Sequence, residues 1–260
     1  MQNLATAHPR EIRAQIREGK WRRPTGGLAA GYAQANLAVL PRDLAYDFLL
    51  FCQRNPKPCP VLEVLDVGSP HPVRMAAGAD LRSDVPLYRV YRSGELEAEV
   101  TDLHDHWRED LVAFLLGCSF SFEAALASAG IPLRHIEEER TISVYITSIQ
   151  CVPAGMFAGP LVVSMRPIPL DRVAKAVEVT ARYPMVHGAP VHIGDPAALG
   201  IVDIARPDYG EAVTIREGEV PVFWACGVTP QAVARQARPE LMLTHAPAHM
   251  FVTDLRNDEL

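Results

Sequence analysis

Hydrophobic and polar positions divide the chain into short apolar runs and amphipathic helical segments. Three segments share one order: an apolar strand, a break at proline or polar residues, and an amphipathic helix. Continuous apolar strands that alternate with helices are typical of a sheet covered on both faces. The pattern therefore predicts an α/β fold with a mixed sheet flanked by helices. The three strand–helix pairs are residues 35–41 with 42–53, 161–166 with 171–182, and 220–227 with 229–237.

The remaining periodic segments predict one further helix and a smaller part of the fold. Residues 9–18 have helical spacing, with Gly19 as the stop. Residues 61–65 form a short apolar run, and residues 88–100 read as a hairpin turning at Ser93-Gly94-Glu95. We expect a smaller α+β two-layer part at about residues 58–106, inside a single unit that spans residues 1–260.

The segment from Trp107 to Ala129 has the most informative pattern. Leu111, Phe114 and Leu115 recur at helical spacing, which predicts an amphipathic helix. The Gly117-Cys118-Ser119 break ends it, and a second helix is expected from about residue 121 to 129. The sequence thus predicts a glycine turn between two largely buried helices.

This turn carries Cys118, Ser119 and Ser121, with Glu123 just inside the second helix. Helix N-termini present unpaired N–H groups and attract carboxylates and phosphates, so the turn is a candidate anion pocket. The alternative is structural: either serine caps the helix, and Cys118 fills core space.

Two histidines and an aspartate gather in the Gly/Pro-bounded segment 183–196. His187 and His192 are an odd number of residues apart, so on one straight strand they would face opposite ways. Histidine titrates near neutral pH and suits proton transfer, and Asp195 could orient one ring. The alternative is that both rings bond backbone carbonyls in tight turns.

A second histidine pair, His245 and His249, has the His-x-x-x-His spacing of some zinc sites. Pro247 lies between them and no HExxH glutamate is present, so we expect no metal here. These histidines more plausibly contact substrate, orient a loop or act as acid/base groups.

Ligands in open α/β sheets bind beyond the carboxyl ends of the strands. That rule selects Arg166, Cys226, Gly227 and Thr229. Cys226 precedes a predicted helix N-terminus, where a lowered thiol pKa would make it a nucleophile; a buried structural thiol is the alternative.

Composition narrows the function classes. The 260 residues carry a net charge of −6 and no Lys/Arg-rich run, which gives no support for nucleic-acid binding. No apolar stretch approaches the ~20 residues that span a membrane, and the start is polar, so we expect a cytoplasmic protein. Five cysteines without a CxxC pair predict neither a zinc knuckle nor a dithiol motif. No nucleotide-binding fingerprint appears, and we expect no cofactor.

Taken in order, the motifs resemble the D-glutamate cyclase family, whose bacterial members carry a hydro-lyase label. The resemblance covers almost the whole chain and implies an α/β fold with a smaller two-layer part. It supplies no catalytic set. The residues that carry it are 34–37, 48–58, 107–123, 159–167, 187–196, 223–231 and 244–254.

The resemblance implies that D-glutamate becomes 5-oxo-D-proline by loss of water. On that hypothesis Ser119, Ser121 and Arg166 hold carboxylates, and Glu123 is the general acid if burial raises its pKa. His187 or His192 moves the proton. Two alternatives stay open: a hydro-lyase for another small hydroxy or amino acid, and a non-catalytic small-carboxylate binding protein. A small carboxylate is the expected partner in each case, and a homo-oligomer stays open.

Overall fold

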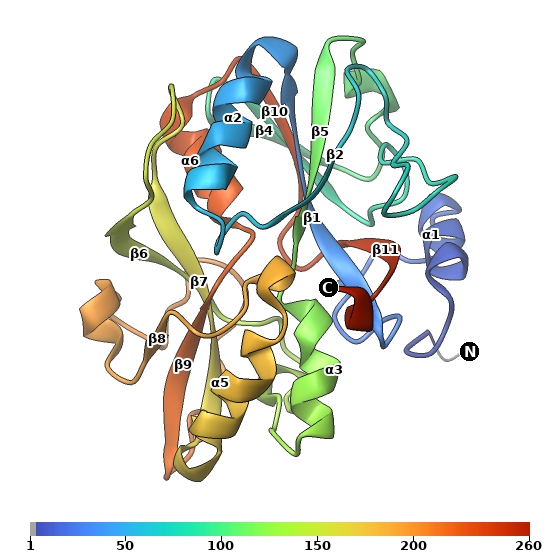
Figure 1. Cartoon of the computed structure of the whole chain (residues 1–260). Helices are drawn as coiled ribbons and strands as arrows, with labels where there is room; N and C mark the ends of the chain where they lie inside the picture. Colours follow the sequence, from blue (N-terminus) through green and yellow to red (C-terminus); the bar gives the residue numbers. More distant parts are fainter. Residues whose placement is uncertain (1–3) are drawn as a thin grey trace.

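Two antiparallel sheets organise the computed structural model, which describes residues 4–260 apart from the side chains of residues 231, 234 and 235 (Figure 1). The larger sheet has the strand order β2-β5-β1-β10-β3-β4, and β11 pairs with the first half of β1. The smaller sheet has the order β6-β7-β9-β8. The strands are β1 Tyr32–Pro41, β2 Val61–Val64, β3 Tyr88–Arg92, β4 Glu95–Val100, β5 Leu111–Gly117, β6 Val144–Gln150, β7 Pro160–Pro169, β8 His192–Ile193, β9 Glu219–Ala225, β10 Leu241–His245 and β11 Phe251–Arg256.

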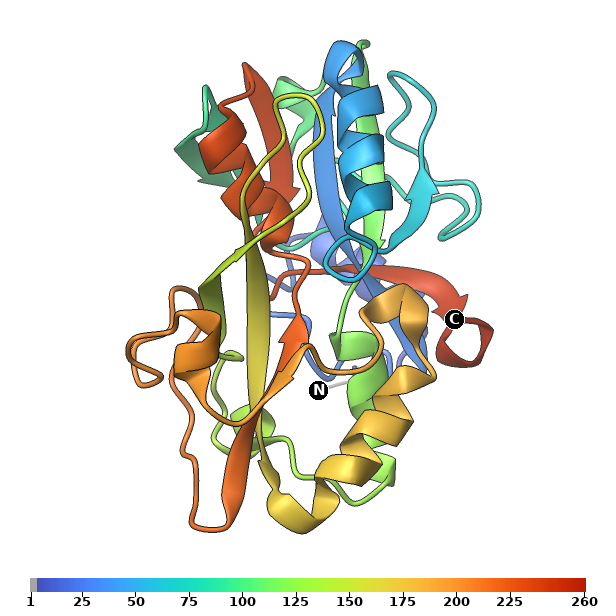
Figure 2. The ribbon, with the colours of Figure 1, turned by 60° about the vertical axis from the view of Figure 1, so that its left-hand side comes forward.

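Helices cover both sheets. In Figures 1 and 2, α2 lies beside the larger sheet, and α3 and α5 lie next to each other on the smaller one. Helix α6 lies near β10 in both views and packs against β7 of the smaller sheet. Phe122 of α3 and Val179 of α5 pack in one cluster with Trp224 of β9, which fixes both helices on that sheet. The helices are α1 Pro9–Arg17, α2 Arg42–Arg54, α3 Phe120–Ser128, α4 Arg134–Glu137, α5 Val173–Ala181 and α6 Thr229–Ala237, with 3-10 segments that include η3 Pro184–Val186, η4 Pro196–Leu199 and η5 Asn257–Glu259.

One hydrophobic core lies between the two sheets. Phe48 of α2 contacts Phe114 of β5 and Phe157, with ring centroids 4.9 and 5.2 Å apart. The same cluster includes Val163 of β7 and Phe223 of β9. The two sheets therefore belong to one packed unit, and any site between them is held from both sides.

The α/β class and all three predicted strand–helix pairs are confirmed: β1 leads into α2, β7 into α5, and β9 into α6. The hairpin at residues 88–100 is also confirmed. Its turn residues Ser93 and Gly94 have φ of 49° and 82°. Positive φ at both positions matches the right-handed twist of the flanking strands.

The predicted helix around Leu111, Phe114 and Leu115 is wrong, because residues 111–117 form strand β5. All seven residues are buried, because β5 lies between β2 and β1 and its alternate side chains enter two core clusters, one on each face of the sheet. An apolar run covered on both faces loses the alternation that marks a strand, and chance spacing then imitates a helix. The following helix is confirmed as α3.

The prediction that a ligand binds beyond the carboxyl ends of the strands also needs correction. Every strand pairing among the described residues is antiparallel, so neighbouring strands end at opposite edges. Arg166 lies within β7, paired with Val222, and not at its end. Cys226 and Gly227 do follow β9 directly. Within residues 4–260, no helix has both the length and the apolar character needed to cross a bilayer.

Candidate functional site

A small cavity with a few polar side chains in its walls lies where the two sheets meet. It has a volume of about 30 Å³, enough for a group of a few atoms. The larger sheet contributes Asn36 of β1 and His245 of β10, and the smaller sheet contributes Ser164 of β7. Its further walls include Cys118, Ser119, Phe120, Thr141, Tyr209, Cys226 and Pro247. We call it the inner cavity.

The inner cavity brings together residues from three of the predicted motifs. Cys118 and Ser119 come from the turn after β5, Cys226 from the turn after β9, and His245 from the end of β10. These segments are far apart in sequence and meet because β1 and β7 place their neighbouring strands around one point.

Arg166 stands directly behind the inner cavity with a fully buried side chain. Its Nη1 donates to Ser164 Oγ at 3.3 Å, and its Nη2 donates to Ser119 Oγ at 3.2 Å. A hydroxyl that accepts from a guanidinium keeps its own proton to donate elsewhere. Both serines line the inner cavity, so they can present polarised O–H donors to an anion there.

Glu123 is the counterion of this guanidinium. Its Oε1 accepts from Arg166 Nη2 at 2.5 Å and lies 3.1 Å from His135 Nε2. Burial alone would raise the pKa of Glu123, but His135 and Arg166 together lower it below its usual value. The predicted role of Glu123 as a general acid therefore fails, because the carboxylate stays ionised.

Sequence reasoning missed His135 and Ser164. His135 lies in α4, a single helical turn without a recognisable motif, and Ser164 is one polar residue inside an apolar strand. A serine two positions before an arginine on a buried strand was the one available signal, since i and i+2 share a face. Arg166 also lies over the Phe122 and Trp224 rings, at 5.2 and 5.4 Å from their centroids.

His245 presents a neutral imidazole to the inner cavity. Burial lowers its pKa to about 4. Its Nδ1 lies 3.1 Å from Leu37 N and 3.3 Å from Leu37 O, so it accepts from the first or donates to the second, depending on the tautomer. In the tautomer that accepts from Leu37 N, the ring carries its proton on Nε2 and can donate a hydrogen bond there.

The two cysteines of the cavity are not activated. Burial raises the pKa of Cys226 to about 11 and also raises the pKa of Cys118 well above its usual value. The predicted nucleophile at Cys226 therefore fails: desolvation of the thiolate outweighs the nearby helix N-terminus.

Two of the predicted binding residues, Gly227 and Thr229, shape the turn between β9 and α6. A Cβ on Gly227 would lie 1.9 Å from Asn36 Nδ2, so glycine is required by the close approach of Asn36. Asn36 in turn donates to Gly117 O at 2.6 Å. Thr229 Oγ1 accepts from Val162 N and donates to Cys226 O, which fixes the turn between β9 and α6.

A wider hollow of about 450 Å³ adjoins the inner cavity and shares Thr141, Tyr209, Gly210 and Pro247 with it. It carries both signs of charge. Arg89 donates to Glu99 at 2.8 Å and lies 6.0 Å from the centroid of the Tyr209 ring. Its charged or titratable wall residues are Arg89, Glu99, Asp208, Glu211 and His249.

Comparison with known proteins identifies the family. Residues 112–254 match the D-glutamate cyclase family model. The chain belongs to the D-glutamate cyclase family. A relative from Stutzerimonas stutzeri, named "Putative hydro-lyase", is 63% identical over 97% of this chain and 95% of its own. The "Putative hydro-lyase YcsI" of Bacillus subtilis is 59% identical over 97% and 98%.

A solved structure, that of the nitrogen repressor-like protein MJ0159 from Methanococcus jannaschii, matches with a TM-score of 0.39 and 8% identity. It covers 94% of this chain and 97% of that chain. This similarity is too low to bear on the fold or the function.

The remaining predicted catalytic residues of this D-glutamate cyclase family member lie away from the inner cavity. His187 is buried against Lys57, with Nδ1 2.6 Å from the Lys57 carbonyl oxygen, and burial lowers its pKa to about 4. His192 Nε2 is 2.7 Å from the backbone oxygen of Asp195. The exposed Asp195 carboxylate instead accepts from Ala197 N and starts η4. His192 and the Asp195 carboxylate therefore each bond a backbone atom in a tight turn, which matches the structural alternative and not the predicted His–Asp pair.

Two further predicted binding residues, Ser121 and His249, do not line the inner cavity. Ser121 Oγ accepts from Gln34 N at 2.9 Å and faces away from the inner cavity, because it lies two residues beyond Ser119. His249 lines the wider hollow, with Nδ1 2.8 Å from Pro247 O, and burial lowers its pKa. Among the residues that the structure describes, no group of three His, Cys, Asp or Glu side chains could hold a metal ion.

Proposed function

We propose that the chain is a hydro-lyase that converts D-glutamate into 5-oxo-D-proline and water. Its family and the names of its relatives support the hydro-lyase part. The observation that carries the proposal is the buried Arg166, whose two hydroxyl partners Ser119 and Ser164 line the inner cavity. This arrangement offers two polarised donors to one carboxylate.

The sizes of the two spaces suggest how the substrate lies. The inner cavity has room for one carboxyl group, and we assign it to the side-chain carboxylate that reacts. The rest of the molecule then occupies the wider hollow. There the ammonium group meets Glu99, Asp208 and Glu211, and the α-carboxylate meets Arg89. A hydroxy acid would need no such acidic partners.

The reaction balances without a co-reactant. The ammonium group loses one proton, and the neutral amine attacks the carbon of the side-chain carboxylate to form the ring C–N bond. The tetrahedral intermediate then loses one oxygen. Two protons leave the nitrogen in total, and two reach the departing oxygen, which leaves as water. The product keeps the α-carboxylate and gains a lactam N–H.

Each residue has a defined part in this scheme. The hydroxyls of Ser119 and Ser164 stabilise the negative charge that grows on the tetrahedral intermediate, because Arg166 polarises them from behind. In this proposal His245 accepts from Leu37 N through Nδ1 and donates a hydrogen bond from Nε2 to the second oxygen, and its lowered pKa keeps the ring neutral at neutral pH. The carboxylates of the hollow accept the ammonium proton.

An NMR time course of EDTA-treated protein with D-glutamate, and with L-glutamate as a control, tests the proposal. We expect 5-oxoproline to form from the D isomer only. Absence of product from folded protein, also after metals are restored, would contradict the proposal. A screen of small hydroxy and amino acids would then separate another hydro-lyase from a binding protein.

A further inference from the structure

Helix α2 carries apolar side chains on the face that points away from the core. Its inner face buries Phe48, Phe51 and Cys52. Tyr46 and Leu49 lie one turn apart on the outer face and are 74% and 40% exposed. A surface helix usually has charged and polar residues there, so exposed apolar side chains at helical spacing mark a contact surface. We call the exposed residues of this helix the α2 face: Arg42, Asp43, Tyr46, Leu49, Gln53 and Arg54.

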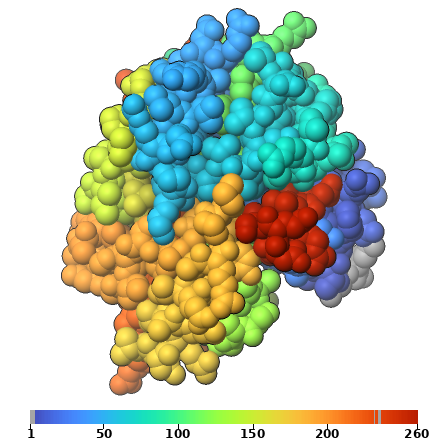
Figure 3. Space-filling model, viewed as in Figure 1, coloured from blue at the N-terminus to red at the C-terminus, as the bar shows by residue number. Residues whose placement is uncertain are grey.

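The connection between β6 and β7 extends this surface. Asn55, at the end of α2, bonds both the N–H and the carbonyl of Val152, and Arg54 donates to Pro153 O. The connection therefore lies along α2; in Figure 3, α2 (blue) forms part of the molecular surface beside it (yellow-green). It adds the exposed side chains of Val152 and Met156 to the apolar area next to the α2 face.

The two ends of the α2 face carry opposite charges. Asp43 lies in the first turn of α2 and Arg54 in the last. They are about three helical turns apart, so both project from the same side of the helix. Arg42 Nε lies 3.9 Å from the Asp43 carboxylate, an exposed contact of little strength. Arg54 donates to a backbone carbonyl oxygen, which carries no net charge to balance the guanidinium.

We propose that the α2 face binds a second copy of this chain, with the two α2 helices antiparallel about a twofold axis. An axis near Leu49 places Asp43 of each copy opposite Arg54 of the other, so the same ion pair forms at both ends. Tyr46 and Leu49 of the two copies then pack together in the middle. Antiparallel packing also sets each helix N-terminus beside the C-terminus of the other helix, which favours the two dipoles.

The distribution of charge selects a second copy over other partners. A surface that binds nucleic acid or an anionic lipid carries positive charge along its length. The α2 face instead has an acidic residue at one end and a basic residue at the other, on the same side of an apolar centre. Such a surface is complementary to itself when one copy is turned by half a revolution, which is the condition for a twofold interface.

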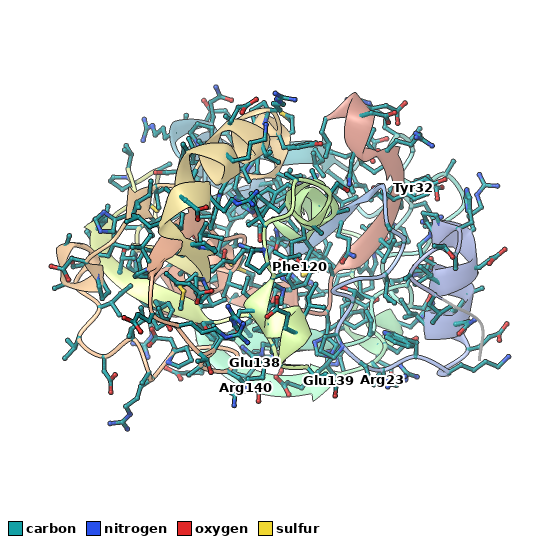
Figure 4. All side chains as sticks on the ribbon, turned by 90° about the horizontal axis from the view of Figure 1, so that it is seen from below. Arg23, Tyr32, Phe120, Glu138, Glu139 and Arg140 are labelled. Carbon is teal, nitrogen blue, oxygen red and sulfur yellow. The ribbon has the colours of Figure 1, made fainter. Side chains whose placement is uncertain are left out.

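The α2 face is separate from the site of the proposed reaction. Among the described wall residues of the inner cavity and the wider hollow, none belongs to α2. Helix α2 lies at the top of the molecule in Figure 1, whereas Figure 4, which looks from below, labels Phe120 of the inner cavity beside α3. Association is therefore measured without turnover, and failure of the cyclase reaction does not bear on it.

Sedimentation velocity of the full-length protein over a range of concentrations tests the proposal. We expect reversible formation of a species with twice the monomer mass and a Kd on the order of micromolar, because one helix pair with its flanking loops makes a small interface. Tyr46→Glu puts two carboxylates into the centre of the interface and should raise the Kd at least about 10²-fold. Val202→Glu, at a fully exposed position outside the α2 face, is the control and should leave the Kd unchanged.

Two charge reversals test the antiparallel arrangement. Asp43→Arg alone sets arginine against arginine at both ends, and Arg54→Asp alone sets aspartate against aspartate, so each should raise the Kd at least about tenfold. An equal mixture of these two variants restores one opposite-charge pair at each end and should form a heterodimer about as tight as the unaltered dimer. Both positions are exposed, and circular dichroism checks that each variant is folded.

Three results would overturn the proposal. The first is an unaltered protein that stays monomeric up to about 1 mM, which would leave the α2 face to a different protein or to none. The second is a dimer whose Kd is the same in Tyr46→Glu, which would place the interface on another face. The third is a mixture of the two charge variants that associates no better than either variant alone.

Discussion

At the scale of single residues, the central feature is a charged side chain that never touches the cavity. Arg166 is fully buried and reaches the inner cavity only through Ser119 and Ser164. Glu123 balances its charge, so the guanidinium remains in place in a dry environment where its effect on the two hydroxyls is large.

Replacing either hydroxyl tests this arrangement. Ser119→Ala and Ser164→Ala should each lower kcat/KM for D-glutamate by about 10²-fold, the usual effect of losing one donor to a developing oxyanion. Ser128→Ala, which removes an exposed hydroxyl from α3, is the matched control. Unchanged kcat/KM in both cavity variants would show that these hydroxyls do not contact the reacting group.

The thiols of the inner cavity allow a second prediction. Since burial raises the pKa values of Cys118 and Cys226, neither is a thiolate at neutral pH. Iodoacetamide should label both slowly at pH 7, much more slowly than in urea-unfolded protein, as measured by mass spectrometry. Cys226→Ser should keep turnover within about threefold, because a nucleophile is not needed. Rapid labelling of folded protein at pH 7 would contradict this interpretation.

At the scale of secondary-structure elements, glycine residues set how closely strands and turns approach. Gly227 packs on Asn36, which joins β1 to the end of β5. Gly117, at that end, leaves no room for a Cβ either: it would lie 1.9 Å from Met185 O in η3. The turns that shape the inner cavity are thus locked by backbone contact.

Gly227→Ala should therefore destabilise the fold. The added Cβ would force Asn36 away and break its bond to Gly117 O, at a cost of about 1–3 kcal/mol in the free energy of unfolding. Gly26→Ala is the control, because its Cβ would meet Phe120 at an ordinary 3.6 Å. Urea unfolding of both variants measures the difference, and equal midpoints would show that Asn36 can move freely.

At the scale of the whole molecule, the two sheets depend on one core and on a few polar bridges. Asn55, at the end of α2, accepts from Val152 N and donates to Val152 O, both at 2.8 Å. These bonds tie the larger sheet's helix to the segment between β6 and β7. The two halves should therefore unfold together.

Stability should fall when the pH is lowered from about 6.5 to 4. Burial lowers the pKa values of His187 and His245 to about 4, so between these limits the unfolded chain binds more protons than the folded one. Their contribution is complete above pH 6.5 and amounts to at most about 3 kcal/mol for each histidine. Glu123, whose pKa is lowered, removes further stability as it is protonated in more acidic solution.

Urea unfolding at pH 7, 5.5 and 4.5 measures this effect. His187→Gln should reduce the slope of unfolding free energy against pH, whereas His106→Gln, a substitution at a half-buried position in a short surface turn, should not. A stability that does not change over this range would contradict neutral burial of the two histidines.

The sequence by itself determined the α/β class, the three strand–helix pairs, the hairpin and the family, because these depend on local periodicity and on contiguous motifs. It also selected Cys118, Ser119, Arg166, Cys226 and His245. It failed at β5, where burial on both faces removed the strand pattern. Local patterns report what a segment prefers, and they do not report which segments will become neighbours.

Only the tertiary structure decided which motifs meet. Strand order placed His245 beside Ser119 and Ser164, and left His187, His192 and Asp195 in turns elsewhere. It also decided the protonation of the site, since the pKa values of Glu123 and Cys226 depend on burial and on partners distant in sequence. Desolvation and charge pairing act through space, and the order of residues along the chain does not contain them directly.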